Sequence, residues 1–363
     1  MGRVRISDVA AAAGVSVSTV SLVMNDVESR IPEATRERVR SAAEQVGYQP
    51  SSVARSLRTQ RTRTVGLISD QIATTPFAGR MLAGAQDVAR EHSHLLFLVD
   101  TGGDVDIERD AIRALGAQRV DAMIYAAMWH RVLSTPAGLP DDAVFLDCRP
   151  AAGGYRSVVP ADREGGRAAV RALTEAGHRC IAYIDTNEDA PIAASLRHEG
   201  YLEALAEAGI EPDPAWHVAA QTSPQGGRIA AERLLDLPEA IRPTAFFCFN
   251  DRMATGVYRA AHARGLDIPR DLSVVGFDDQ QFVAAEQDPP LTTVALPHYE
   301  MGRWAMEAAL GIRAEGEKDA VHHMECPVVR RDSVGPPPAH VGKQNRRRAS
   351  HTTERSRTAT TDR

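Results

Sequence analysis

The feature that most constrains this 363-residue chain is a window near its N-terminus, residues 6–25, that reads as two short helices joined by a tight turn. Gly14 supplies the left-handed backbone conformation that such a turn requires and that costs other residues about 1 kcal/mol or more. Ser7 is expected to cap the first helix and Ser16 the second. Apolar residues recur at helical spacing around the glycine, so the predicted inward side chains are Val9, Ala10, Ala13, Val15, Val20 and Val23.

A third helix is predicted over residues 32–46. Pro32 and Glu33 are typical of a helix start, and Gly47 is typical of the position just after a helix end. The inward face of this helix would consist of Val39, Ala42, Ala43 and Val46. These residues are sufficient to close a small three-helix core.

The charge is distributed unevenly along the chain, whose net charge is -6. Residues 1–64 hold ten arginines, no lysine and six acidic residues, whereas residues 65–339 are strongly acidic. A basic head on an acidic body indicates that the head alone meets a polyanion such as nucleic acid. Chance clustering of surface arginines is the alternative that charge alone leaves open.

The segment after the third helix is predicted to be a short hinge helix. Pro50 ends the preceding element, and a helix of two turns is too short to persist alone in water, so a partner helix and DNA would have to order it. Leu57 lies between Arg55 and Arg58, and more arginines follow. A buried core position is the alternative for this leucine. The flanking charge favours a wedge in the minor groove of DNA, with the arginines at phosphates.

From Thr64 onward, short apolar runs alternate with helical patterns. This alternation predicts parallel β-sheets with helices on both faces. Helical stretches include 162–176, 195–208 and 252–264. The predicted strands are 64–69, 95–99, 121–126, 143–147, 180–185, 216–220, 244–249 and 273–277.

The sequence contains none of the catalytic motifs that would indicate an enzyme. A Walker loop, a His-Glu-x-x-His pair and a Gly-x-Ser-x-Gly elbow are all missing. His322 and His323 lie near Cys326 in a pattern that reads as a terminal strand, but a metal site needs more ligands, so neither a metal nor a cofactor is predicted. No apolar run has membrane-spanning length and no export signal is visible, which predicts a cytoplasmic protein with free, mostly buried cysteines.

Several strings of this sequence resemble the lactose-repressor (LacI/GalR) family of bacterial regulators. They include Val-Ser-Val-Ser-Thr-Val-Ser at 15–21, Val-Ala-Arg-Ser-Leu-Arg at 53–58, Phe-Asn-Asp-Arg-Met-Ala at 249–254 and Asp-Leu-Ser-Val-Val-Gly-Phe-Asp-Asp at 271–279. The resemblance covers residues 3–331 and implies a homodimer that reads a pseudo-palindromic operator in double-stranded DNA. It also implies a two-lobed α/β domain like the periplasmic binding proteins.

The expected organisation is a small all-α helix-turn-helix domain over 1–49 and a hinge helix with its linker over 50–63. An effector-binding and dimerisation domain follows over 64–335, and a disordered basic tail over 336–363. DNA-binding residues are expected in the second helix and the hinge: Ser16, Val17, Ser18, Thr19, Ser21, Leu22, Asn25, Ala54, Arg55, Leu57 and Arg58.

Leu22 departs from the family pattern, because many members carry an arginine at this position. A leucine cannot make the bidentate contact to guanine, and Val17 and Ser18 are also weak readers of bases. Discrimination between operators is therefore expected to depend largely on the central base step and on DNA shape.

Effector-binding residues are expected where parallel strands end, because ligands of such folds lie at the carboxyl ends of strands. Carboxylates that accept from hydroxyls, with an arginine donating back, suit a polyol. The resemblance implies that Arg197, Asn250 and Asp278 are at effector-binding positions and that Phe77 lies in a ligand-facing loop. A helix cap, a solvated turn or a buried aromatic is the alternative in each case. The candidates are Phe77, Asp147, Arg197, Asn250, Asp251 and Asp278.

These observations predict a transcription regulator whose operator affinity is controlled by a small, sugar-like effector. A repressor is the favoured form, and an activator is the alternative that the sequence leaves open. A solute-binding protein that delivers a sugar to a transporter is the first alternative, but it would need an export signal and no basic head. An enzyme with an appended DNA-binding head, such as a sugar kinase, is the second, but it would need a phosphate-binding loop.

The two roles open to Leu57 lead to opposite outcomes for Leu57→Ala. A minor-groove wedge predicts unchanged melting of the free protein and a sharp loss of operator affinity, because unstacking a base step costs a few kcal/mol. Affinity for random DNA should barely change, because the arginines remain. A core leucine would instead cost about 2–5 kcal/mol of stability with or without DNA. Melting curves beside gel shifts on specific and random duplexes distinguish the two; a large drop in melting temperature with unchanged specificity would contradict the wedge.

Overall fold

The computed structural model of the chain describes residues 4–25, 30–48, 61–72, 79–188, 192–313 and 320–339. The predicted hinge helix, Phe77 and the tail from residue 340 therefore lie outside the described residues. The chain divides into two compact units, residues 1–64 together with 116–121, and residues 65–115 together with the chain from Ala122 onward.

The N-terminal unit contains the predicted three helices, α1 (Ile6–Ala13), α2 (Val17–Met24) and α3 (Glu33–Val46). Gly14 has a φ of 64°, and α1 and α2 meet at 104°. The predicted core is confirmed: eight side chains are buried, while Val15 and Val46 are half-buried against them. The buried residues are Val9, Ala10, Ala13, Val20, Val23, Val39, Ala42 and Ala43.

Of the two predicted serine caps, one is confirmed and one is wrong. The Oγ atom of Ser16 accepts a hydrogen bond from the backbone N–H of Thr19 at 3.1 Å, as expected for an N-cap. Ser7 lies inside the first turn of α1, and Arg5 is the N-cap residue. The Asp8 carboxylate accepts from the backbone N–H of Arg5 at 2.8 Å, so the acidic side chain rather than a serine stabilises this helix start.

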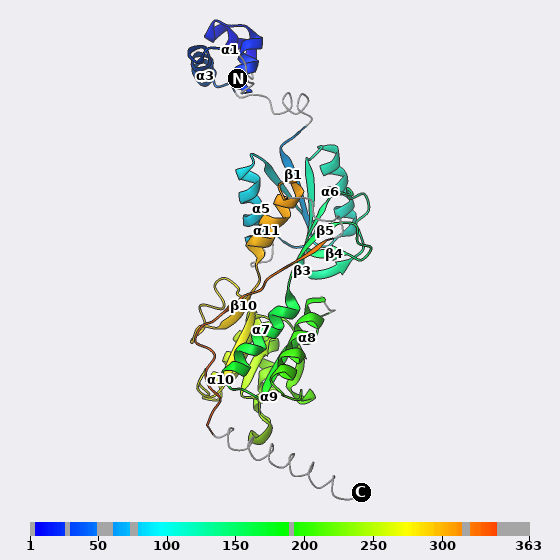
Figure 1. Cartoon of the computed structure of the whole chain (residues 1–363), viewed down its shortest axis with the longest axis vertical. Coiled ribbons are helices and arrows are strands. Elements are labelled where there is room, and N and C mark those ends of the chain that lie inside the picture. Colours follow the sequence, from blue (N-terminus) through cyan, green and yellow to red (C-terminus); the bar gives the residue numbers. More distant parts are fainter. Residues whose placement is uncertain are drawn as a thin grey trace, which may run out of the picture. The chain divides into compact units, whose positions relative to one another are not determined.

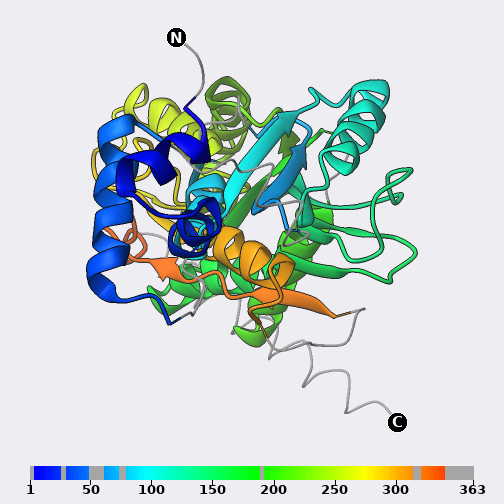
Figure 2. The same cartoon turned by 90° about the horizontal axis from the view of Figure 1, so that it is seen from above.

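The first sheet of the larger unit has the strand order β11-β5-β4-β3-β1-β2. Helices α5 (Gly79–Glu91) and α11 (His298–Ala309) lie side by side on one face, and α6 (Val105–Ala117) lies on the other (Figures 1 and 2). The strands are β1 (Thr64–Ser69), β2 (Leu95–Asp100), β3 (Ala122–Leu133), β4 (Val144–Pro150), β5 (Arg156–Pro160) and β11 (Val321–Met324). Side chains alternate accordingly: Val65 and Leu67 belong to the core with α5 and α11, whereas Gly66 faces Leu115 of α6.

The second sheet has the strand order β12-β10-β9-β8-β6-β7. Its strands are β6 (Ile181–Thr186), β7 (His217–Ala220), β8 (Ala245–Cys248), β9 (Ser273–Asp278), β10 (Thr292–Ala295) and β12 (Val328–Val329). Its helices are α7 (Asp162–Glu175), α8 (Ile192–Glu207), α9 (Pro224–Leu235) and α10 (Asp251–His262), with short 3₁₀ turns at Pro214–Trp216 and Glu239–Ile241.

The chain passes between the two sheets three times, after β5, after β10 and after β11. The described strand pairs are parallel except β10 with β12. The predicted two-lobed α/β architecture is therefore confirmed, and each lobe has its own buried core.

The predicted strand positions match the structure, with three omissions and two extensions, of which the shorter carries β4 past Asp147 to Pro150. Strands β5, β10 and β12 were not predicted, because runs of five, four and two residues carry little periodicity. Strand β3 continues to Leu133 instead of ending at Ala126, with an irregularity in its pairing to β4 between Ala126 and Arg131. All four cysteines are free, and Cys148, Cys248 and Cys326 are buried.

Within the described part of the chain, no single helix is both long and apolar enough to span a membrane. The bent pair of α1 and α2 passes that test by length and composition alone.

His178 joins three segments of the second lobe. Its Nδ1 atom pairs with the Thr244 hydroxyl at 2.9 Å, and its Nε2 atom lies 2.9 Å from both the Ser273 hydroxyl and the carbonyl oxygen of Gly335. Burial lowers the pKa of His178 to about 4. The neutral ring therefore holds the beginnings of β8 and β9 and the segment after β12 together.

Acidification should destabilise the protein through His178. The unfolded side chain takes up a proton near pH 6.5 and the folded one only near pH 4, so this stabilisation is complete above pH 6.5 and is lost as the pH falls towards 4. The difference is on the order of 3 kcal/mol. Urea unfolding of His178→Gln should show a flatter dependence of stability on pH, whereas the same change at the exposed His92 should retain the wild-type dependence. A wild-type slope in His178→Gln would contradict this role.

Candidate functional site

The exposed face of α2 is poor in polar groups that could contact a base. Val17 is 46% exposed and Ser18 is exposed. Thr19, Ser21, Leu22 and Asn25 are half-buried. The Oγ atom of Ser16 and the amide of Asn25 are already engaged, the latter donating to the carbonyl oxygen of Ser21 at 2.7 Å. Ala54, Arg55, Leu57 and Arg58 lie outside the described residues, so the DNA-binding set remains a prediction.

The larger unit contains a second candidate site, centred on the buried guanidinium of Arg197. Its Nε atom donates to Asp162 Oδ1 at 2.8 Å, and its Nη1 atom donates to the carbonyl oxygen of Phe249 at 2.7 Å. The guanidinium also lies over the Phe277 ring, 3.6 Å from the ring centroid. Hydrogen bonds, an ion pair and a cation–π contact together compensate for the burial of this charge.

Asp162 receives a partner from each lobe. Besides Arg197 on α8, His130 on β3 lies with its Nδ1 atom 2.8 Å from Asp162 Oδ2. Burial acts to raise the pKa of Asp162, but Arg197 and His130 outweigh it and the pKa is lowered. Asp162, at the start of α7, is therefore the ionised link between the strand of one lobe and the helix of the other.

Asp278 ends β9, and its buried carboxylate has fewer charged partners than that of Asp162. Its Oδ1 atom is 3.7 Å from Arg197 Nη1, which is too far for a hydrogen bond, and its Oδ2 atom accepts from Gln280 Nε2 at 2.7 Å. Burial raises the pKa of Asp278 to about 6, although Arg197 opposes the rise. Its φ of 104° is in the left-handed region, a strain that often marks functional positions.

Two cavities adjoin Asp278. The smaller has a volume of about 130 Å³, and its lining includes Trp129 from the first lobe and Thr186, Arg197, Asn250 and Asp278 from the second. The larger has a volume of about 420 Å³ and lies among Arg80, Asp278, Leu296 and His298. Asp278 therefore lines both spaces and is the polar residue that the two cavities share.

Asn250 and Asp251 follow β8, but only Asn250 lines the smaller cavity. Asn250 caps α10 by accepting from the N–H of Met253 at 2.9 Å. Asp251 is fully buried and does not line the smaller cavity. Its oxygens accept from the N–H of Gln280 at 2.7 Å and from the hydroxyl of Thr293 at 2.6 Å. This arrangement joins α10 to the strands beside it.

Asp147 lies inside β4, which continues to Pro150, so the prediction that this residue ends the strand is wrong. The residue is buried and has a φ of 56°, in the left-handed region. Burial and the neighbouring Asp162 raise its pKa well above the ordinary value. Its Oδ1 atom, His130 Nε2 and Arg252 Nε are buried without a hydrogen-bond partner among the described residues. Such atoms are rare in folded proteins, so their concentration around this site indicates a place where water or a polar ligand binds.

A close approach between α7 and α8 fixes the position of Arg197. A Cβ atom on Gly166 of α7 would lie 2.5 Å from the carbonyl oxygen of Arg197, and one on Gly200 of α8 would lie 2.1 Å from that of Arg163. Only glycine at both positions allows this spacing, which places Arg197 beside Asp162.

Comparisons with known proteins agree with these features. Residues 5–51 match the bacterial regulatory proteins of the lacI family, and residues 170–334 match the periplasmic binding protein-like domain. The HTH-type transcriptional repressor PurR of Vibrio atlanticus is 35% identical over 91% of this chain and 98% of its own length. The chain belongs to the lacI family of bacterial regulatory proteins.

Other relatives of this lacI-family protein are also named as regulators rather than enzymes. The HTH-type transcriptional regulator RegA of Clostridium saccharobutylicum is 32% identical over 91% of this chain and 98% of its own. The structure of the Lac repressor dimer bound to operator and the anti-inducer ONPF matches with a TM-score of 0.74 and 26% identity, over 92% of this chain and all of that chain. A complex of the regulator CelR with cellobiose matches with a TM-score of 0.62 and 30% identity, over 91% of this chain and all of that one. The lacI-family protein is thus a DNA-binding transcription regulator with a ligand-binding domain.

Sequence reasoning brought Arg197, Asn250 and Asp278 of this lacI-family protein to one site but missed Trp129, His130 and Asp162. The first two lie on the extension of β3, beyond the predicted end of the strand, and Asp162 begins a helix instead of ending a strand. A Trp-His-Arg sequence directly after an apolar strand is the signal that could have revealed the extension.

The glycine contact between α7 and α8 makes Gly166→Ala a test of how Arg197 is positioned. The added methyl group should force the helices apart, lower the stability by about 1–3 kcal/mol and weaken effector binding. Gly116→Ala in α6 is the matched control, because a Cβ atom there meets nothing within 4 Å and alanine favours a helix. Thermal melting of both variants measures the effect; wild-type stability of Gly166→Ala would show that the approach is not required.

Proposed function

We propose that this lacI-family regulator is a cytoplasmic, homodimeric repressor whose affinity for a DNA operator is controlled by a small, hydroxyl-rich effector such as a sugar. The class of effector is inferred from Asp278, whose Oδ2 atom accepts from Gln280 while its Oδ1 atom lies beside Arg197 but too far from it for a hydrogen bond.

The chemistry of the smaller cavity favours hydroxyl groups. The Oδ1 atom of Asp278 is 3.7 Å from Arg197 Nη1, too far to accept a hydrogen bond from it, so a ligand hydroxyl could donate to this oxygen. Trp129 is 39% exposed and lines the same cavity, so its ring offers an apolar surface to the C–H face of a sugar. Charged acceptors and an aromatic face together fit a polyol better than a purely apolar ligand.

The relatives support the same class of effector and the direction of regulation. PurR is named a transcriptional repressor, and CelR binds the disaccharide cellobiose. For this chain, we propose Arg197, Asn250 and Asp278 as effector contacts, with Phe77 and Asp147 as further candidates. Asp251 is proposed to anchor α10 behind the wall, because both of its oxygens already have partners.

The DNA contacts are proposed to come from α2 and the hinge. The exposed Val17 and Ser18 offer methyl groups and a single hydroxyl, and Leu22 offers no polar group. Such a surface supports positioning on the DNA and contact with thymine methyl groups more than base-specific hydrogen bonding. This composition is consistent with a large share of the specificity coming from DNA deformation by the hinge.

The first lobe presents an apolar surface that supports a dimer. Strand β2 is at the edge of its sheet, and Leu95, Phe97 and Leu98 on it are exposed, the first by 65%. Val105 and Ile107 on the neighbouring α6 are also exposed. Exposed apolar side chains on an edge strand and on the helix that follows it are typical of a subunit interface, and we propose that a second copy of the chain covers them.

A ligand screen followed by two variants tests the effector proposal. A thermal-shift screen of the full chain against sugars, sugar phosphates and nucleosides should identify a stabilising ligand, which at 100 times its dissociation constant adds about 2.7 kcal/mol. Calorimetry should then show that Arg197→Ala and Asp278→Ala each weaken binding by about 1.5–3 kcal/mol, because a charge-assisted hydrogen bond is lost. Operator binding without effector should remain intact.

Asp279→Ala is the matched control for Asp278→Ala. Asp279 lines only the larger cavity and pairs with Arg331 at 2.7 Å, so its loss should leave the affinity of a ligand in the smaller cavity unchanged. Unchanged ligand affinity in Arg197→Ala and Asp278→Ala would assign both residues to purely structural roles.

A further inference from the structure

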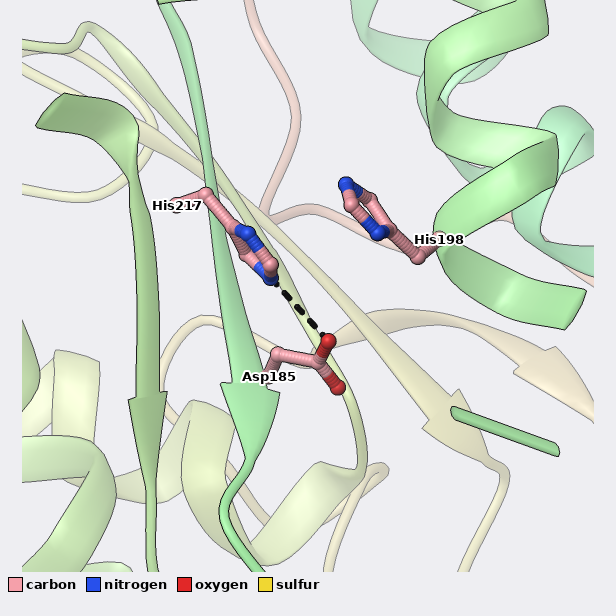
Figure 3. A group of neighbouring side chains, drawn as sticks. All are labelled: Asp185, His198 and His217. Atoms are coloured by element: carbon pink, nitrogen blue, oxygen red, sulfur yellow. Dashed lines mark hydrogen bonds and ion pairs between the residues drawn. The ribbon is translucent and has the colours of Figure 1, made fainter. Parts of the chain in front are cut away.

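Three potential metal ligands meet on the second lobe, outside the set that lines the two cavities. Asp185 ends β6, His198 is on α8 and His217 begins β7, and Figure 3 shows the two imidazole rings facing each other above the carboxylate. One ligand atom from each residue lies within 4.8 Å of the other two. Because the residues come from three different elements, the fold rather than local sequence brings them together.

The spacing of Asp185 and His217 is close to that of two ligands on one ion. His217 Nε2 lies 3.0 Å from Asp185 Oδ2. In a tetrahedral zinc site with bonds of about 2.0–2.1 Å, two ligand atoms are about 3.4 Å apart, so a small displacement would allow both to bind the same ion. The existing hydrogen bond would then be replaced by two metal–ligand bonds.

His198 provides the third ligand. Its ring centroid lies 4.2 Å from that of His217, at an interplanar angle of 29°. Neither of its ring nitrogens has a hydrogen-bond partner among the residues that the structure describes, although the residue is half-buried. The ring packs against Tyr183, Tyr201 and His217, so its rotation towards Asp185 and His217 would shift these ring contacts but break no hydrogen bond.

The remaining contacts of the cluster resemble the outer shell of a metal site. Asp185 Oδ1 accepts from the Tyr183 hydroxyl at 3.1 Å and from the backbone N–H of Thr186 at 2.7 Å, which orients the carboxylate and leaves Oδ2 towards the histidines. The Tyr183 ring stacks on His217 with an interplanar angle of 4°. Partners of this type hold ligands in position before the ion arrives.

We propose that Asp185, His198 and His217 bind one divalent transition-metal ion, and that Zn²⁺ fits this ligand set best. Two imidazoles and a carboxylate suit zinc, whereas Mg²⁺ and Ca²⁺ favour oxygen ligands alone. The His217 side chain is 34% exposed, so the ion has access from solvent and a water molecule can complete four-coordination.

The bound ion would also reach the wall of the smaller cavity. Thr186 directly follows Asp185, Arg197 directly precedes His198, and both line that cavity. An ion that joins β6, β7 and α8 would therefore restrain this wall. The metal site itself does not depend on the identity of the effector or on the proposed function.

Metal titration of the untagged, chelator-treated full-length protein tests the site. Calorimetry should show one Zn²⁺ per chain, with a rise in melting temperature, and Co²⁺ should give the visible absorption of a four-coordinate site with nitrogen and oxygen ligands. His198→Asn and His217→Asn should each weaken Zn²⁺ binding at least as much as the roughly 10- to 100-fold that the loss of an outer-shell partner costs.

His262→Asn is the matched control, because His262 is an exposed histidine on α10 of the same lobe. It should retain wild-type Zn²⁺ affinity, and circular dichroism without metal should show that all three variants are folded. The proposal is overturned if the wild type binds no zinc, if folded His198→Asn retains the wild-type affinity, or if His262→Asn loses as much affinity as His198→Asn.

Discussion

The rest of the larger unit depends on the buried ion pair between Arg197 and Asp162. A guanidinium that is 4% exposed costs several kcal/mol to desolvate unless its partners are held in place. The close contact of α7 and α8 at Gly166 supplies that constraint, because it places the backbone of Arg197 against the helix that begins with Asp162. Removing either partner would leave an uncompensated buried charge, at a cost of about 3–5 kcal/mol.

This ion pair also connects the wall of the smaller cavity to both lobes. His130, on a strand of the first lobe, shares Asp162 with Arg197 of the second lobe, and Arg197 lies beside Asp278 in the cavity wall. A ligand that engages Asp278, as we propose, would change the electrostatic balance around Arg197 and thus around the carboxylate of Asp162, which both lobes contact. If this group of side chains has a second arrangement that the effector favours, binding of the effector could shift the balance between the two and so alter the affinity for DNA.

Local rules in the sequence predicted the parts of the fold whose causes are local. The three helices of the head follow from apolar spacing, Gly14 and Ser16. The strand-end rule found Asn250 and Asp278 because Asn250 lies just beyond β8 and Asp278 ends β9. The rule could not find Asp162, whose role depends on a helix that approaches another at glycine contacts. Trp129 and His130 were missed because an irregularity in β3 carries the strand past its expected end. The grouping of Asp185, His198 and His217 arises from three separate elements, so no spacing in the sequence reveals it. Asp251 shows the reverse case, since it lies just beyond β8 yet does not line the smaller cavity.

The measurement that tests this account most directly is the operator affinity of the full-length protein with and without saturating effector. The operator is first selected from genomic fragments. We expect sequence-preferred binding that weakens steeply with salt. We also expect an effector-induced change in affinity of about 5- to 150-fold in one direction, as coupling energies of about 1–3 kcal/mol require. Asp278→Ala is expected to bind the operator normally but to lose most of this change. The absence of any preferred fragment, or an operator affinity that a bound effector leaves unchanged, would contradict the account.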